Sequence, residues 1–430
     1  MEQKERYTHK HSRVEDAITH QLRMRMNQYY KDNQDKVTSN IDTINALLLY
    51  TYLSFVYKEE PHHTYGFTIN DQDNFYTVIQ GEPNITLIKE AMYRLPTYNQ
   101  KLLDVFEPFN YAKEEQYIKD LIDIIVGMLS KNRQGFRFVY EYLNGIINQR
   151  RFSFHRGQST SRLKSKLIGR LILSSINKES LLIQEYDGSK SQLFPMIRRL
   201  NQKDNYSKDI HYVYDAENLE EDVYIYTKLL ISGFELSEFS MRNTTPKDII
   251  IAYRDSRSKK SLVQEIQSKL NNLNENGKLF LVSSNALLFR GFEDNEARHY
   301  LIDNHLIESI ISLPEKLGRR HNIFVLNNQK NECINMIDLS KQGIEYHSDS
   351  SLIEQELLQM YLEPNNDNHD NKLVSYQEVI DHDYILSLNR YIEVLEEESL
   401  NIDDLEKRYE KLYQKNLKNK EKLFKKLEQL

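Results

Sequence analysis

The spacing of apolar residues changes along this 430-residue chain. Residues 1–130 combine long polar stretches with apolar runs at helical spacing, as over residues 44–49 and 117–125. This pattern is typical of amphipathic helices. From about residue 136 to residue 345, short apolar runs alternate with amphipathic stretches, which favours strands joined by helices. We therefore predict a helical N-terminal domain over residues 1–135 and an α/β core over residues 136–345.

Seven short apolar runs are the candidate strands of this core. Amphipathic stretches over residues 161–176, 218–233 and 260–275 separate several of them and are predicted helices. Strands that alternate with helices form a largely parallel, doubly wound sheet. The predicted fold class is therefore α/β with a Rossmann-like core. The candidate strands cover residues 181–183, 210–214, 248–252, 278–282, 306–311, 323–326 and 334–337.

The third region, residues 346–430, is more polar and contains a predicted loop or linker over residues 363–371. Its charged C-terminal segment carries a heptad-like seam, and polar residues on such a seam can fix register and partner number. Two interpretations stand side by side: a coiled-coil helix that binds a protein partner or a second copy, and a helix packed on its own domain. The seam consists of Ile402, Leu405, Tyr409, Leu412, Asn416, Asn419, Leu423, Leu427 and Leu430.

Composition narrows the class of protein. Hydrophobic residues make up 39% of the chain and charged residues 28%, which is usual for folded globular proteins. No apolar run approaches the ~20 residues of a membrane span, and the charged N-terminus is unlike a signal peptide, so we expect a cytoplasmic protein. Cys333 is the single cysteine, which excludes an intramolecular disulfide. The pair His62 and His63 has no second ligand cluster nearby, so we predict no metal site.

Nucleic-acid binding would need a local basic surface, because the formal net charge is −7. One segment could provide it, since residues 150–170 contain seven basic residues and no acid. The segment is either a DNA-contacting surface or an ordinary solvated face. Its basic residues are Arg150, Arg151, Arg156, Arg162, Lys164, Lys166 and Arg170.

Motifs of the central region follow one another in the order of a known enzyme family. From residue 136 to residue 393 the chain resembles the modification (M) subunits of type I restriction-modification systems, which are adenine-N6 DNA methyltransferases. This resemblance implies a class I methyltransferase fold, the cofactor S-adenosylmethionine, a specificity subunit as partner and duplex DNA as substrate. The matching stretches are residues 138–143, 156–161, 182–191, 213–218, 248–256, 277–291, 306–314, 323–328, 337–340 and 384–392.

The resemblance also identifies the positions at which the cofactor would bind. Thr160 falls on the threonine of the family's Gly-Gln-aromatic-aromatic-Thr-Pro stretch, and Gly188 and Ser189 fall on its Asp-Pro-x-Cys-Gly-Ser-Gly turn. Glu217 matches the glutamate that holds the ribose hydroxyls. That turn needs glycines for close approach of the backbone and an acid at its start. Gln184 stands in place of this acid and Lys190 in place of the closing glycine, so we expect no cofactor.

The catalytic motif is replaced altogether. After its fourth strand the family carries Asn-Pro-Pro-aromatic, whose amide oxygen and backbone carbonyl accept the hydrogens of the adenine amine while the ring stacks on the flipped base. The corresponding residues of this chain are Tyr253, Arg254, Asp255 and Ser256. The amide and both prolines are missing, and the aromatic ring stands at the opposite end of the motif.

Three functions are compatible with these observations. The leading hypothesis is a pseudo-methyltransferase, a non-catalytic protein-binding component that can also bind DNA. The alternative is a divergent but active S-adenosylmethionine-dependent adenine-N6 DNA methyltransferase. The retained residues Thr160, Gly188 and Glu217 support it. The third is a nucleic-acid-binding module that uses the basic segment without any cofactor. Binding of S-adenosylmethionine separates the first two, and salt-dependent retention on DNA identifies the third.

Overall fold

The fold is that of a computed structural model of the chain. Structural statements below concern the part of the chain whose placement the structure describes. This part comprises residues 22, 24–37, 39–59, 66–80, 84–99, 102, 105–106, 116–126, 139, 162–186, 193–204, 206–215, 219–241, 243–254, 261–289, 292–314, 322–340, 350–364 and 369–392.

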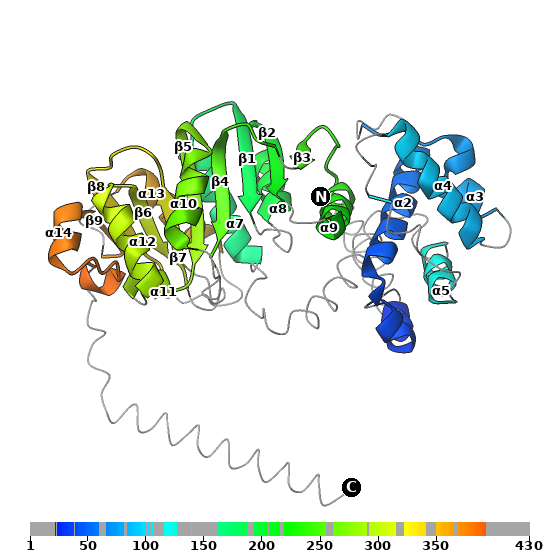
Figure 1. The fold of residues 1–430 in the computed structure, drawn as a ribbon, viewed down its shortest axis with the longest axis horizontal. Helices are drawn as coiled ribbons and strands as arrows, with labels where there is room; N and C mark the ends of the chain where they lie inside the picture. Colours follow the sequence, from blue (N-terminus) through cyan, green and yellow to red (C-terminus); the bar gives the residue numbers. More distant parts are fainter. Residues whose placement is uncertain are drawn as a thin grey trace, which may run out of the picture.

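The described elements of the N-terminal region are helices, and strands and helices alternate after it, as the apolar spacing predicts (Figure 1). The helices are α2 (Ile41–Glu59), η1 (Asp71–Asp73), α3 (Phe75–Val78), α4 (Ile85–Tyr98), α5 (Gln116–Ile124), α7 (Arg162–Ser175), α8 (Leu193–Lys203), α9 (Leu219–Ile231), α10 (Leu262–Asn271), α11 (Ala286–Phe289), α12 (Phe292–Asp303), α13 (Ser350–Leu362), α14 (Tyr376–Asp381) and η7 (Leu388–Arg390). The strands are β1 (Ser180–Tyr186), β2 (Asp209–Asp215), β3 (Phe239–Met241), β4 (Lys247–Tyr253), β5 (Leu273–Ser283), β6 (Ile307–Ser312), β7 (Asn322–Leu326), β8 (Cys333–Asp338) and β9 (Asn371–Ser375).

These strands form one sheet in the order β3-β2-β1-β4-β5-β7-β6-β8-β9. The strands from β3 to β5 are parallel, as are β6 and β8. Strand β7 runs antiparallel between β5 and β6, and β9 is antiparallel to β8. All seven predicted strands are confirmed, and the sheet is largely parallel, as predicted. The antiparallel direction of β7 was not predicted. The sequence did not predict β3 and β9, the two edge strands.

Helices cover both faces of the sheet (Figure 1). One face packs against α7, α8, α9 and α13, and the N-terminal helices join this side through contact between α2 and α9. The other face packs against α10, α11, α12 and α14. Every residue of β4 is buried, because a central parallel strand is covered on both sides. This explains its continuous apolar run of residues 249–252.

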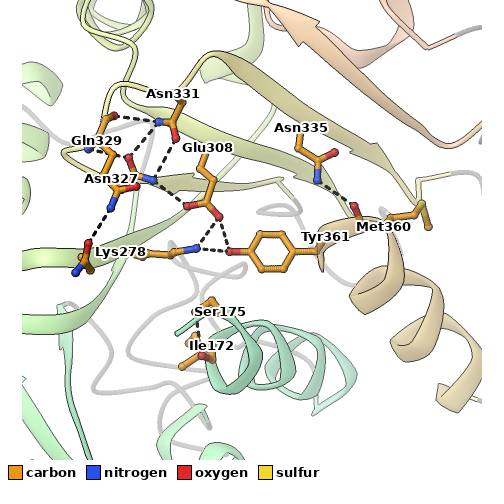
Figure 2. Close-up of polar contacts among 11 residues, drawn as sticks. Ile172, Ser175, Lys278, Glu308, Asn327, Gln329, Asn331, Asn335, Met360 and Tyr361 are labelled. Carbon is orange, nitrogen blue, oxygen red and sulfur yellow. Dashed lines mark hydrogen bonds and ion pairs between the residues drawn. The ribbon is translucent and has the colours of Figure 1, made fainter. Parts of the chain in front are cut away.

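Helix α13 is fastened to the sheet by polar side chains (Figure 2). The Tyr361 hydroxyl donates to Glu308 Oε1 at 2.7 Å, and Lys278 Nζ lies 2.7 Å from the same oxygen and 3.1 Å from the Tyr361 hydroxyl. Asn327 donates to the other carboxylate oxygen at 2.8 Å. Nearer the sheet edge, the Asn335 amide donates to the Met360 carbonyl at 3.0 Å.

The sheet therefore extends past residue 345, the predicted end of the α/β core. Strand β9, α13 and α14 all belong to it, since β9 pairs with β8 and α13 packs on α7. The core reaches at least Ile392, which is buried with the residues of the second face. The polar residues between β8 and β9 give no sign of this continuation in the apolar spacing. The heptad-like seam from Ile402 to Leu430 lies outside the described residues.

Within the ranges given above, no helix is both long enough and apolar enough to cross a membrane.

Candidate functional site

The order of the strands reverses between β1 and β4. From β1 the chain builds outward to β2 and β3, and from β4 it builds outward in the other direction to β5. Open α/β sheets bind ligands in the crevice beyond the carboxyl ends of the strands at such a switch point. The candidate site therefore lies where β1 ends at Tyr186 and β4 ends at Tyr253.

Two side chains join the ends of these strands. Tyr253 donates its hydroxyl to Glu185 Oε1 at 2.8 Å. Glu185 is fully buried and Tyr253 is 8% exposed. Glu185 is paired with Ile251 in the parallel register, and Tyr253 follows two residues later on the same face. Both side chains consequently point to the side of the sheet covered by α7, α8 and α9.

Helix α9 adds a buried cation to this pair. The side chain of Lys228 is 1% exposed, and its ammonium group lies 5.9 Å from the centre of the Tyr214 ring at the end of β2. Burial lowers the pKa of Lys228 to about 8, and the negative charge of Glu185 acts in the opposite direction. We call Glu185, Tyr253 and Lys228 the strand-end cluster. Its members belong to β1, β4 and α9.

Arg254, the next residue of the replaced catalytic motif, points to the opposite face. Its Nη1 lies 3.3 Å from Glu265 Oε2 on α10, and its backbone N–H donates to the Val282 carbonyl at 2.9 Å. The side chain is 7% exposed. Arg254 is thus held by α10 and β5.

The buried acid of β1 is displaced by one residue from the acid of the family turn. Gln184, which occupies the family position, is paired with Ile250 and lies on the α10 face, and it is 4% exposed. Successive strand residues point to opposite faces, so Glu185 cannot replace the missing acid by a small adjustment. The strand-end cluster therefore differs from the cofactor turn of the family in position as well as in composition.

Several sequence-predicted site residues lie outside the described part of the chain. They include the four cofactor candidates and the second half of the catalytic motif. Three of the predicted DNA-contacting arginines fall there as well. The residues concerned are Thr160, Gly188, Ser189, Glu217, Asp255, Ser256, Arg150, Arg151 and Arg156.

The structure describes the part of the basic segment that lies in α7. Arg162 begins α7, and two residues later Lys164 is 2% exposed, so its side chain is not part of an exposed basic surface. Lys166 forms an ion pair with Glu354 of α13. Arg170 contacts the same carboxylate at 3.0 Å and Asp204 at 2.9 Å. These contacts fasten α13 to α7 and partly neutralise the basic charge of the helix.

Sequence reasoning did not find the strand-end cluster. Weak signals for it exist, because Glu185 is an acid inside an apolar strand and Lys228 interrupts the apolar face of a helix. Charged residues are rarely fully buried unless they are paired. Such positions in predicted core elements indicate internal partners, but the sequence does not identify those partners.

Glu185, Tyr253 and Arg254 are all engaged with other parts of the protein. None of them supplies the turn acid or the amide of the family. Nowhere in the described ranges do three or more His, Cys, Asp or Glu side chains gather closely enough to hold a metal ion.

Comparison with known proteins agrees with the architecture. Residues 248–399, less than half of the chain, match the N-6 DNA Methylase family model. The fold is that of the class I methyltransferases. A methyltransferase subunit of a type I restriction-modification system from Streptococcus thermophilus aligns with a TM-score of 0.67 and 14% identity, covering 87% of this chain and 100% of that one.

Two further structures extend this likeness. The type IIG restriction endonuclease BpuSI aligns with a TM-score of 0.54 and 12% identity over 84% of this chain and 46% of its own length. A chain from a type I restriction-modification assembly aligns with a TM-score of 0.53 and 12% identity over 91% of this chain and 94% of its own. The resemblance to type I M subunits is confirmed at the level of the fold and of the matched family region.

Proposed function

We propose that this chain is a pseudo-methyltransferase, a protein that keeps the scaffold of a type I M subunit, does not transfer methyl groups, and serves as a protein- and DNA-binding component. The observation that carries the proposal is the orientation of Tyr253. This residue occupies the position of the catalytic asparagine, and its hydroxyl is donated inward to Glu185. The adenine amine requires acceptors at this point, held by a rigid loop.

The neighbouring residue supports the same conclusion. Arg254 stands where the family has its first proline, and its guanidinium pairs with Glu265 on the opposite face of the sheet. The two described motif positions are therefore both tied to the protein interior. Neither offers an amide oxygen or an exposed ring to a base. The chain can keep its sheet without keeping the geometry that methyl transfer needs.

A methyl-transfer assay tests this proposal. Purified full chain is incubated with duplex DNA and S-adenosylmethionine that carries a radiolabel in its methyl group. We expect no label on adenine above a protein-free control, and calorimetric titration should detect no micromolar binding of the cofactor. An active adenine-N6 DNA methyltransferase run in parallel shows that the assay works.

Methyl transfer to adenine would contradict the proposal. Label on adenine that disappears in Tyr253→Ala or Asp255→Ala would identify a divergent active enzyme.

DNA binding is tested on the same mixtures by gel shift over a salt series. Because Lys164 is buried and Lys166 is paired, this contact is expected to depend on Arg150, Arg151 and Arg156. Loss of the shift in Arg156→Glu would agree with it.

A protein partner is the second part of the proposal. It is supported by the heptad-like seam of the C-terminal segment. It is supported further by the fold likeness to a chain whose structure is described as an assembly of the type I restriction-modification system. We propose that this segment mediates association, with a second copy of the chain as the simplest partner.

A further inference from the structure

The switch point between β1 and β4 is bridged by the protein itself. In an α/β enzyme a ligand occupies the crevice at this point and contacts both strands. Here the Tyr253 hydroxyl and the Glu185 carboxylate, 68 residues apart in sequence, connect the same two strand ends at 2.8 Å. The bond is buried, and the negative charge of Glu185 acts on the fully buried Lys228 of α9.

The members of the strand-end cluster depend on one another. A carboxylate with no exposed surface is costly to bury unless hydrogen bonds and an opposite charge offset the lost hydration. Glu185 receives the Tyr253 hydroxyl from β4 and lies within the electrostatic reach of Lys228 from α9. Removing one member therefore leaves another buried group incompletely compensated, which couples three elements at the switch point.

We propose that the strand-end cluster holds the ends of β1 and β4 in a single conformation without any ligand, at the switch point of the sheet. This inference rests on the proposed non-catalytic function. The ends of β1 and β4 then stay rigid without a bound cofactor. A chain that has lost the cofactor keeps a stable core because its own side chains fill that structural role.

Hydrogen exchange measured by mass spectrometry on the full chain tests the inference. Tyr253→Phe removes only the hydroxyl and leaves the carboxylate of Glu185 buried without that donor. We expect the amides of residues 182–186 and 249–253 to exchange about tenfold faster or more, since an unsatisfied buried acceptor costs well above the value of a neutral hydrogen bond. Amides of β6 and β7 should be unchanged, which shows that the variant is folded.

Tyr376→Phe is a matched control. It also removes a buried hydroxyl, one that bonds the backbone of Ile307 at the start of β6. It should accelerate exchange near residue 307 and leave β1 and β4 as they are. Should Tyr253→Phe fail to fold, Glu185→Gln replaces it. Glutamine keeps an oxygen for the hydroxyl but removes the charge beside Lys228, so exchange should then rise in α9 as well as in β1.

The wild type is measured with and without excess S-adenosylmethionine, which separates the two proposals. We expect no effect of the compound at the strand ends. Slower exchange in its presence would mean that a cofactor completes the site, and both proposals would fail. No effect of the compound together with unchanged exchange in Tyr253→Phe would overturn the role of the cluster alone and leave the non-catalytic function standing.

Discussion

Two carboxylates, one at each end of the central strands, illustrate how buried charge is stabilised in this protein. At the carboxyl ends of the strands, Glu185 accepts a hydrogen bond from Tyr253, and its negative charge raises the pKa of Lys228 against the effect of burial. At the amino ends of the strands lies Asp248, the second residue of β4. It accepts hydrogen bonds from Lys178, the Leu182 backbone and Asn274 at 2.6, 2.9 and 2.9 Å. These contacts fasten β4 to β1 and β5. Both carboxylates therefore connect strands that are distant in sequence.

Asp248 gives a prediction with a definite pH dependence. Burial raises the pKa of Asp248, but its three hydrogen bonds and the charge of Lys178 outweigh burial, so the pKa lies below its ordinary value of 3.8. A lowered pKa contributes stability that is present above 3.8 and is lost as the pH falls through the folded-state pKa. Asp248→Asn should reduce the free energy of unfolding at pH 7 by about 1–3 kcal/mol.

Urea denaturation of wild type and Asp248→Asn at a series of pH values measures this effect. The difference between the two proteins should be constant near neutrality and should shrink as the pH is lowered below about 4. Asp71→Asn, at an exposed position of η1, serves as the control and should change little. A difference that grows on acidification would show that the sign of the pKa shift is wrong.

At the scale of elements, burial decides what the sequence can predict. The central strands were recognisable because a strand covered on both faces has a continuous apolar run, as in residues 249–252. Strand β3 has three residues, and β9 carries Asn371, Lys372 and Ser375, so neither edge strand shows such a run. Tertiary pairing alone makes them strands.

The side-chain contacts between elements could not be predicted from the sequence, for a different reason. The alternation of side chains in β4 assigns Tyr253 and Arg254 to opposite faces, but it does not select Glu185 and Glu265 as their partners. That selection depends on the strand order and on which helix covers each face. The same holds for Lys166, whose sequence context favours an exposed basic face and whose actual partner is Glu354, 188 residues away.

Helix α13 offers an element-scale prediction. The Tyr361 hydroxyl donates to Glu308 beside Lys278, and burial together with the charge of Glu308 holds the pKa of Tyr361 well above its usual value (Figure 2). Tyr361→Phe should lower the free energy of unfolding by about 1–3 kcal/mol, because Glu308 loses a donor inside a partly buried network. Chemical denaturation measures the loss.

The control for Tyr361 is Tyr93→Phe, a hydroxyl removal on α4 at a side chain that is 66% exposed, which should leave stability unchanged. Double-mutant analysis adds a sharper criterion. Glu308→Ala and Tyr361→Phe together should cost less than the sum of the single losses, because each substitution alone already removes the hydrogen bond between them. Strict additivity would mean that the two side chains do not interact in solution.

At the scale of the whole molecule, the N-terminal helices and the sheet share one apolar core. Buried residues of α2 and of α9 belong to the same cluster as the first face of the sheet, and these two helices are in contact. The described structure ends at Ile392, before the heptad-like seam begins at Ile402.

The seam supplies the last prediction. If it mediates association, the full chain, of 51.3 kDa, should have about twice that mass by size exclusion with light scattering at high concentration. Leu405→Glu with Leu412→Glu should reduce it to a monomer with an unchanged melting temperature. Lys407→Glu with Lys411→Glu, off the seam, should remain associated. A wild-type chain that is monomeric at every concentration, and whose melting temperature falls in the leucine variant, would show instead that the helix packs on its own domain.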